Sequence, residues 1–330
     1  MAEGRTGDAE RPEGGREGGR PPERPTQLPG GSWWAAVKRT VREFQTDNLS
    51  DWAAALTYYS VLSIFPALLV LISLVDLAGP GTTQRLLDNL GQVVPGSVNQ
   101  ILADAIRNLQ QTRGSAGVLA LVGLATALWL ASRYIAAFMR ASNAIYDVPE
   151  GRPVWKTLPI RIGVTMVVMV LLAASAVAVV ATGGLAARLG RLLGIGSTAI
   201  RVWDLAKWPV LLLIVGFLFA LLYWASPNAR QPFRWITPGG ILAVVVWVIA
   251  SAAFALYVAN FNSYNKTCGS LASVIIFLVW LWLSNTAILL GAELNAELER
   301  SRAIAGGHPP EEEPYIELRD TRKIRERDGL

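Results

Sequence analysis

The chain has 330 residues, of which 52% are hydrophobic and 17% charged, and its formal net charge is +5. Soluble domains carry roughly 25% charged residues, so the shortfall favours a protein whose main solvent is lipid. The positive charge is typical of the cytoplasmic flanks of a membrane protein, and no nucleic-acid partner is expected. A single Cys and a single His exclude an internal disulfide and a Cys/His zinc cluster.

The N-terminal part contains two different segments. Residues 1–31 are rich in Gly, Pro, Arg and Glu, which predicts a disordered tail, and they lack the apolar stretch of a signal peptide. Residues 32–45 carry apolar side chains near one helical face, with basic residues elsewhere. This pattern predicts an amphipathic helix on the inner membrane surface, and a soluble docking helix is the alternative.

Six apolar runs follow, and each is long enough to cross a bilayer, which takes about 20 residues. They are expected at residues 52–77, 116–139, 162–185, 207–225, 238–261 and 271–294. The sequence therefore predicts an all-α, polytopic integral membrane protein with six spans, forming a membrane domain over residues 32–302. Apolar stripes at 79–114 and 186–206 predict further amphipathic helices on the outer surface. Residues 303–330 are polar and predict a disordered, charged C-terminal tail.

The first span contains a proline and a group of hydroxyl side chains. Pro66 removes the backbone hydrogen bond to the carbonyl of Leu62 and predicts a bend. The hydroxyls just upstream could satisfy freed backbone groups or could line a polar pathway. The residues concerned are Tyr58, Tyr59, Ser60 and Ser63.

Further polar residues are expected at membrane depth, and three of them are candidates for a site. Asn285 lies in the middle of the sixth span, where it suits either interhelical hydrogen bonding or a polar pathway. Arg133 and Glu293 both fall in the inner half of their spans. Because lipid solvates neither charge, we expect the second and sixth spans to be neighbours, with the two side chains paired or lining one polar cavity. Independent snorkelling to the headgroups is the alternative.

The last hydrophobic hairpin begins with a helix-start signal. Thr237 is placed to cap the fifth span, and Pro238 then occupies the first helical position, where a missing N–H costs nothing. Gly239 and Gly240 would let another backbone approach closely.

Orientation follows from the distribution of Lys and Arg. With the N-terminus inside, the inner segments hold 21 of these residues and the outer segments hold 8. Positive charge belongs on the cytoplasmic side, so both termini are predicted to be cytoplasmic.

Motifs for catalysis are missing from the sequence. The chain contains no P-loop, no GxSxG and no HExxH, and its His308 lies in the polar tail. We expect no cofactor, no metal site and no enzymatic activity.

Several stretches resemble a known family, in this order along the chain: AAALTYYSVLSIFPALLVLISL at 53–74, ASNAIYDV at 141–148, LYWASPN at 222–228, TPGGILAVVVW at 237–247 and the long stretch from 261 to 299. Together they resemble the YihY and virulence factor BrkB family of bacterial inner-membrane proteins. The resemblance covers about residues 33–300. One departure is Cys268, where the family usually has Tyr before Gly269.

The resemblance implies a multi-pass protein of the bacterial inner membrane with a role in the cell envelope, such as transport of a lipid or small solute. Membrane lipids are then the expected partners, with a homo-oligomer and unidentified envelope proteins as further partners. Proteins of this kind have also carried the label ribonuclease BN. A nuclease needs metal-held carboxylates or acid–base pairs, and the sequence predicts isolated acids at membrane depth. A ribonuclease and an envelope scaffold are therefore the alternatives.

Overall fold

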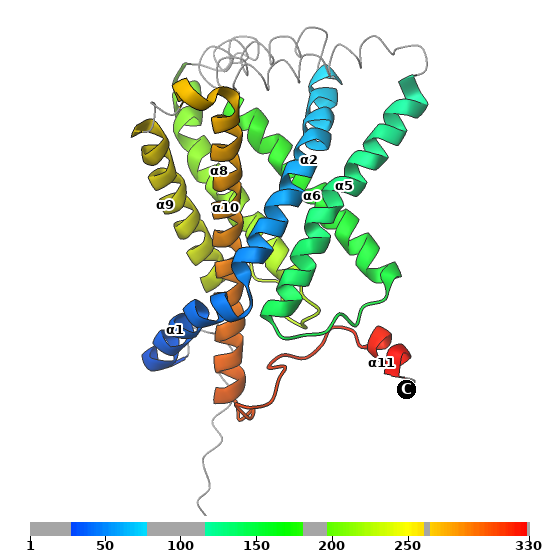
Figure 1. Cartoon of the computed structure of the whole chain (residues 1–330), viewed down its shortest axis with the longest axis vertical. Helices are drawn as coiled ribbons and strands as arrows, with labels where there is room; N and C mark the ends of the chain where they lie inside the picture. Colours follow the sequence, from blue (N-terminus) through cyan, green and yellow to red (C-terminus); the bar gives the residue numbers. More distant parts are fainter. Residues whose placement is uncertain (1–27, 78–115, 181–196, 261–264, 329–330) are drawn as a thin grey trace, which may run out of the picture.

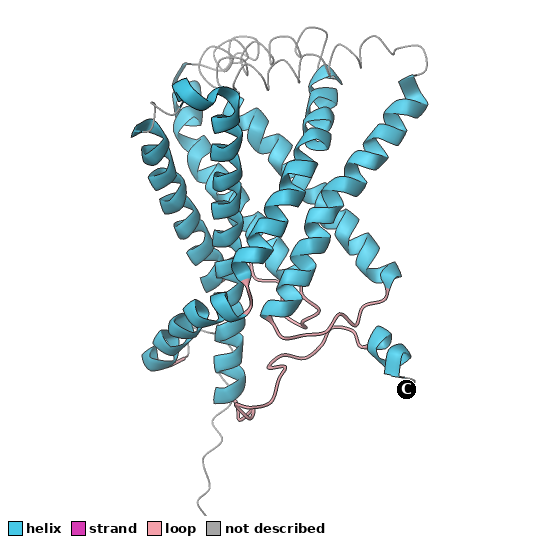
Figure 2. Cartoon of the chain, in the orientation of Figure 1, coloured by secondary structure: helices cyan, strands magenta, loops and turns pink. Residues whose placement is uncertain are grey.

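The computed structural model describes residues 28–77, 116–180, 197–260 and 265–328. These residues form helices and loops, with one isolated antiparallel bridge between Ala229 and Leu318, as Figure 2 shows. The described helices are α1 (Gly30–Thr46), α2 (Leu49–Leu77), α5 (Ala116–Ile145), α6 (Val154–Val180), α8 (Ser197–Ala225), α9 (Pro238–Asn260), α10 (Asn265–Ala305) and α11 (Arg322–Asp328).

Long helices lie side by side and run between two ends of the molecule, with α1 and α11 at the same end (Figure 1). Within the described residues, four helical stretches are long and apolar enough to cross a membrane: Val154–Ser175, Leu205–Ala225, Pro238–Val258 and Val274–Ala305. The predicted all-α, polytopic membrane fold is confirmed. The other two long helices, α2 and α5, coincide with the first two predicted spans, so the predicted six spans are compatible with the structure.

The helices extend beyond several predicted span boundaries. α6 begins eight residues before its predicted start at 162, and α10 continues to Ala305, past the charged residues that follow the apolar run. Residues 197–206, predicted as part of a separate surface helix, are the first turns of α8. The predicted amphipathic helices at 79–114 and the rest of 186–206 fall outside the described residues.

The start of α9 shows why this segment becomes a helix at Pro238. The Thr237 hydroxyl accepts a hydrogen bond from the Gly240 N–H at 3.0 Å, as the predicted cap requires. A Cβ on Gly239 would lie 1.9 Å from the carbonyl oxygen of Gly291 on α10. The close approach predicted for Gly239 is therefore confirmed, and it locks α9 against α10.

The core lies toward the end of the bundle that carries α1 and α11. α10 is central, because it packs against α9, α2, α1 and α5. Leu56, Phe138, Tyr223 and Leu289 are buried there and come from four different helices. Large apolar side chains elsewhere on the bundle are exposed, including Ile249, Leu256, Leu213 and Ile275. This distribution is expected of helices that face lipid.

The predicted amphipathic helix is present as α1. Ala36 and Thr40 are buried, whereas the apolar side chains of Trp34, Val37 and Val41 are exposed. Since α1 packs against α10 with its small residues, its Trp and Val face is left for the membrane surface.

Candidate functional site

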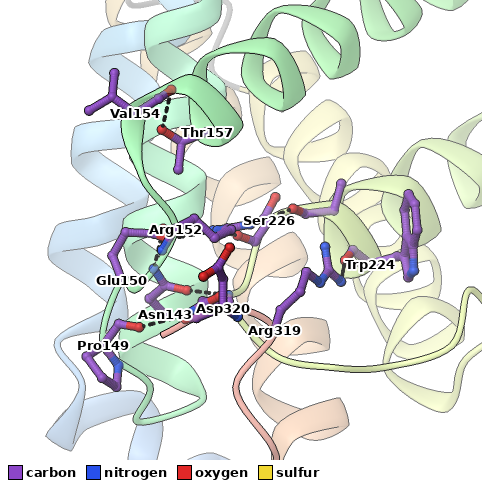
Figure 3. Close-up of polar contacts among 12 residues, drawn as sticks. Asn143, Pro149, Glu150, Arg152, Val154, Thr157, Trp224, Ser226, Arg319 and Asp320 are labelled. Carbon is purple, nitrogen blue, oxygen red and sulfur yellow. Dashed lines mark hydrogen bonds and ion pairs between the residues drawn. The ribbon is translucent and has the colours of Figure 1, made fainter. Parts of the chain in front are cut away.

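A buried cluster of polar side chains joins the loops at the α1 and α11 end. We call it the polar clamp; Figure 3 shows most of its members, and it consists of Asn143, Glu150, Arg152, Asn228 and Asp320. The Arg152 side chain is 1% exposed. Its guanidinium donates to both carboxylate oxygens of Glu150, at 2.8 and 2.7 Å, and to the carbonyl of Ser226 at 2.7 Å. Arg152 thereby caps the end of α8, and its own charge is compensated.

Two asparagines connect the last turn of α5 to the loop after α8. The backbone N–H of Asn228 donates to Asn143 Oδ1 at 2.7 Å, and Asn143 Nδ2 donates to Glu150 Oε2 at 3.0 Å. Asn143 and Asn228 belong to two of the stretches that carry the family resemblance, ASNAIYDV and LYWASPN. The sequence alone predicts no role for them, although polar uncharged residues at the ends of apolar runs were the available signal.

The C-terminal segment completes the polar clamp, which corrects the predicted disordered tail at 303–330. Asn228 Nδ2 donates to the Asp320 carbonyl at 2.9 Å, and the Asp320 N–H donates to Asn228 Oδ1 at 3.1 Å. A Cβ on Gly151 would lie 2.0 Å from the Asp320 carbonyl oxygen. The segment is ordered through Asp328, because its backbone pairs with Asn228 and its Ile316 and Leu318 side chains pack against the core.

The Asp320 carboxylate is held by two cations. Lys156 Nζ lies 2.7 Å from one oxygen, and Arg322 contacts the same carboxylate at 3.1 Å. These hydrogen bonds hold the pKa of Asp320 well below its usual range. The carboxylate therefore stays ionised, and it ties α11 to the start of α6.

A cavity of about 490 Å³ lies beside the polar clamp, between the end of α8, the loop from Gln231 to Thr237 and α10. Its walls are aromatic and apolar, with a few polar groups: Tyr146, Ala220, Tyr223, Trp224, Gln231, Pro232, Arg234, Trp235, Ile236, Thr237, Pro238, Asn295, Leu298 and Glu299. Such volumes and linings are usual for small-molecule sites.

Hydrogen bonds fix the walls of this cavity. Asn295 accepts from the Gly239 N–H at 2.9 Å and donates to the Thr237 hydroxyl at 3.1 Å. Gln231 Nε2 donates to the Tyr223 carbonyl at 2.8 Å. The cavity wall is thus preorganised at the start of α9 and at the end of α8.

The loop that borders the cavity exposes large aromatic and apolar side chains. Phe233, Trp235 and Ile236 are 43%, 54% and 75% exposed, next to Arg234. The Trp235 ring lies 5.4 Å from Phe217, and Phe233 lies 5.6 Å from Trp224, in edge-to-face geometry. Aromatic rings beside basic residues are typical of the headgroup region of a bilayer.

On another face of α10, two carboxyl groups meet, and we call Asp47 and Glu293 the acid pair. A side-chain hydrogen bond joins them. Glu293 is 1% exposed, and its Oε2 has no hydrogen-bond partner among the described residues. Glu293 is therefore not the isolated acid that the sequence predicts, because the turn after α1 brings Asp47 to it.

Arg133 and Glu293 do not form the predicted ion pair. The Arg133 guanidinium is exposed and lies 5.7 Å from the ring centroid of Trp129, which Arg161 also approaches, at 4.5 Å. Glu293 instead faces Asp47. The helices α5 and α10 do pack together, but these two side chains project from different faces.

Asn285 joins three helices near the centre of the bundle. It is buried, accepts a hydrogen bond from the Tyr134 hydroxyl of α5 at 3.0 Å and donates to the Thr57 hydroxyl of α2 at 3.1 Å. The geometry matches the interhelical hydrogen bonding expected of this residue.

The hydroxyl-bearing residues of α2 form hydrogen bonds mainly within their own helix. Ser60 donates to the Leu56 carbonyl at 2.9 Å, and Ser63 donates to the Tyr59 carbonyl at 2.6 Å. Tyr58 is 59% exposed, and its ring contacts Tyr59 edge to face. α2 continues past Pro66, whose side chain falls outside the described residues.

Known proteins resemble this chain over most of its length. A match to the family described as virulence factor BrkB covers residues 40–316. The ribonuclease-like protein YfkH of Bacillus subtilis is 31% identical over 269 residues, which is 80% of this chain and 93% of YfkH. UPF0761 membrane proteins of Alkalilimnicola ehrlichii and Aromatoleum aromaticum are 33% and 32% identical, over 77% and 76% of this chain.

The match spans 56% and 61% of those last two relatives, so each of them is longer than the part it shares with this chain. No solved structure matches the chain. The matched region extends from within α1 to the C-terminal segment and includes the cavity, the acid pair and all of the polar clamp except Asp320. On this match, the chain belongs to the virulence factor BrkB family of membrane proteins.

Proposed function

We propose that this protein moves or holds an amphipathic molecule, a lipid or a small solute, at the bilayer surface, and that it does so without covalent catalysis. The cavity of about 490 Å³ carries this proposal. Its aromatic walls suit an apolar portion, and Arg234 and Glu299 at its lining suit a polar headgroup.

The setting of the cavity supports a ligand that comes from the membrane. Trp235 and Ile236 line the cavity and are also exposed, so one loop contributes to both the site and the surface beside it. Side chains of this kind lie at the headgroup level in membrane proteins. A lipid could therefore reach the cavity without crossing bulk water.

We further propose a location in the bacterial inner membrane with both termini cytoplasmic. α1 and α11 lie at the same end of the bundle, and the Lys and Arg distribution favours that end as the inner one (Figure 1). Reporter fusions after Gly31, at the connection between α9 and α10 and after Leu330 would test this. A cytoplasmic signal from the fusion at this connection would contradict it.

Reconstitution tests the proposed activity. Vesicles would contain the purified protein and a headgroup-labelled phospholipid, and a membrane-impermeant quencher would report movement between leaflets; a parallel assay would measure solute uptake. We expect Trp235→Ala to slow the active assay several-fold. Trp208→Ala is the matched control, because Trp208 is also exposed, at 61%, but does not line the cavity. Wild-type vesicles that are inactive in both assays would overturn the proposal.

The name of the relative YfkH makes ribonuclease activity the alternative. The same purified protein would be incubated with RNA. If the wild type degrades RNA and Glu293→Gln does not, the function is nuclease activity rather than transport. An envelope scaffold would show neither activity and would instead retain a partner protein during purification.

A further inference from the structure

We propose that Asp47 and Glu293 together form a binding site for one exchangeable proton, and that this proton holds the turn between α1 and α2 against α10. The inference is independent of which molecule the cavity accepts.

The local backbone fixes Asp47 at this position. α1 ends at Thr46, and the Asp47 N–H donates to the Glu43 carbonyl at 2.8 Å. Asn48 then adopts φ 51°, a left-handed conformation that Asn tolerates better than most residues. The chain reverses there into α2. Asp47 is therefore presented to α10 by a tight turn that leaves its side chain little freedom.

The contact between the two acids requires a proton. Ionised carboxylates only accept hydrogen bonds. A hydrogen bond between two carboxyl groups therefore requires that one of them is protonated. Two like charges in direct contact also disfavour the doubly ionised state. Burial, followed by the carboxylates of Asp147 and Glu43, raises the pKa of Asp47 to about 6.

Among the residues that the structure describes, the nearby arginines form their ion pairs with another acid. Arg39 and Arg300 both form ion pairs with Glu297 on α10, and Arg39 also donates to the Ser301 hydroxyl at 2.7 Å. Within the described residues, no ion pair involves Asp47 or Glu293. The titratable and charged groups that act on the pair or on its neighbours are Glu43 of α1, Tyr146 and Asp147 after α5, Glu297 and Arg300 of α10, and Glu313 of the C-terminal segment.

The two carboxyls differ in their access to water. The more accessible one allows the proton to exchange with the solvent. Glu293 is 1% exposed, and its Oε2 is buried without a hydrogen-bond partner among the described residues. Asp47 is half-buried and lies in a loop at the end of the bundle. Protons can therefore reach the pair through Asp47. Loss of the shared proton leaves two negative charges in contact, and these repel the turn from α10.

The pH dependence has a definite sign. A carboxyl whose pKa is raised on folding contributes stability that is fully present below its unfolded pKa of about 4 and that is lost as pH rises through the folded value. For Asp47 this loss centres on about pH 6. The hydrogen bond to Glu293 favours the ionised form of Asp47, so this first step leaves the shared proton in place. The contact between the turn and α10 should therefore loosen at alkaline pH, where the shared proton is also lost.

The test uses the full-length protein in lipid nanodiscs, with thermal unfolding followed from about pH 5 to about pH 10. We expect the wild-type midpoint to fall by several degrees as pH rises. Glu293→Gln and Asp47→Asn should flatten this profile and raise the midpoint at the alkaline end. Asp51→Asn is the matched control, since Asp51 is exposed, lies four residues away and should leave the profile as in the wild type.

Infrared difference spectroscopy of the wild type gives a second readout that does not depend on any variant folding. A protonated carboxyl band should persist at neutral pH and disappear as the pH is raised. Absence of that band, or variants whose midpoints drop equally at every pH, would overturn the proposal. A pH dependence that Na⁺ or Ca²⁺ abolishes would also overturn it, because a metal ion would then occupy the pair.

Discussion

The polar clamp and the acid pair lie at the same end of the bundle, yet only the polar clamp gives its buried charge compensating partners. In the polar clamp, Arg152 meets the Glu150 carboxylate and two backbone carbonyls, so every part of its guanidinium fork has a partner. In the acid pair, Glu293 meets another acid and leaves one oxygen without a hydrogen bond among the described residues.

The difference separates a structural cluster from a functional candidate. Compensated buried polar groups hold elements in one arrangement. A buried polar group without a compensating partner reduces stability, and such groups are typical of functional sites. The polar clamp therefore fixes the loops, whereas the acid pair is the part of this end that can change state.

The largest expected effect comes from removing the cation of the polar clamp. Arg152→Ala would leave the Glu150 carboxylate and the carbonyls of Ala225 and Ser226 without their donor. We expect a loss of about 3–5 kcal/mol in the free energy of unfolding, measured by denaturant titration in detergent micelles. A loss below about 1 kcal/mol would mean that Arg152 contributes no more to stability than a surface charge. The contrast between the polar clamp and the acid pair would then be wrong.

A smaller loss is expected at Asn228, which links the clamp to the C-terminal segment. Asn228→Ala removes its side-chain bonds to Pro149, to the Asp320 carbonyl and to the Asp320 N–H. We expect about 2–3 kcal/mol, because buried backbone groups are left unpaired. Limited proteolysis should then cleave after Ala305 faster than in the wild type. Unchanged cleavage would mean that the segment is held elsewhere.

The helices could be predicted from the sequence because apolar length alone specifies them. The clamp could not, because its partners lie far apart in the chain: Asn143 and Asn228 are separated by 85 positions, and Asn228 and Asp320 by 92. The C-terminal segment was predicted to be disordered since its composition is polar. Its order depends on hydrogen bonds to Asn228 and on the packing of Ile316 and Leu318 against the core, and composition reveals neither.

The predicted pair between Arg133 and Glu293 failed for a different reason. Position along a span gives depth in the bilayer, and both residues do lie toward the same end of their helices. Depth does not give the direction in which a side chain points around the helix axis. Arg133 projects toward Trp129, and Glu293 projects toward Asp47, whose position depends on the turn at Asn48.

Asn285 provides a neutral comparison with both charged clusters. Asn285→Ala removes hydrogen bonds to Tyr134 and Thr57, and interhelical bonds in membranes are worth about 0.6 kcal/mol each. We expect a loss of about 1 kcal/mol that is independent of pH. Thr286→Ala is the control, because the Thr286 hydroxyl bonds only within its own helix, to the Trp282 carbonyl at 2.8 Å. A pH-dependent loss for Asn285→Ala would link this residue to the acid pair.

Acid should weaken the polar clamp, which is the opposite of its effect on the acid pair. Because the pKa of Asp320 is depressed on folding, its contribution is present above the unfolded value of about 4 and is lost as pH falls below it. The effect should be modest, since the Lys156 side chain is 42% exposed. Thermal unfolding below about pH 4 should show this loss in the wild type. Asp320→Asn should abolish this loss of thermal stability at acidic pH. If the variant loses as much stability in acid as the wild type, the loss comes from another carboxyl.

The smallest effect is expected at the exposed ion pair of Arg230 and Glu317, although it joins the same two segments as the polar clamp. Their side chains are 76% and 79% exposed, and the closest N–O distance is 3.4 Å. Water and salt screen such a pair, so Arg230→Ala should cost less than about 0.5 kcal/mol. The link between the segments survives in this variant, because the Arg230 N–H donates to the Glu317 carbonyl at 2.8 Å through the backbone. A double-mutant cycle with Glu317→Ala, followed by denaturant unfolding, measures the pair directly. A coupling as large as the loss in Arg152→Ala would show that burial does not distinguish the clamp from the surface charges around it.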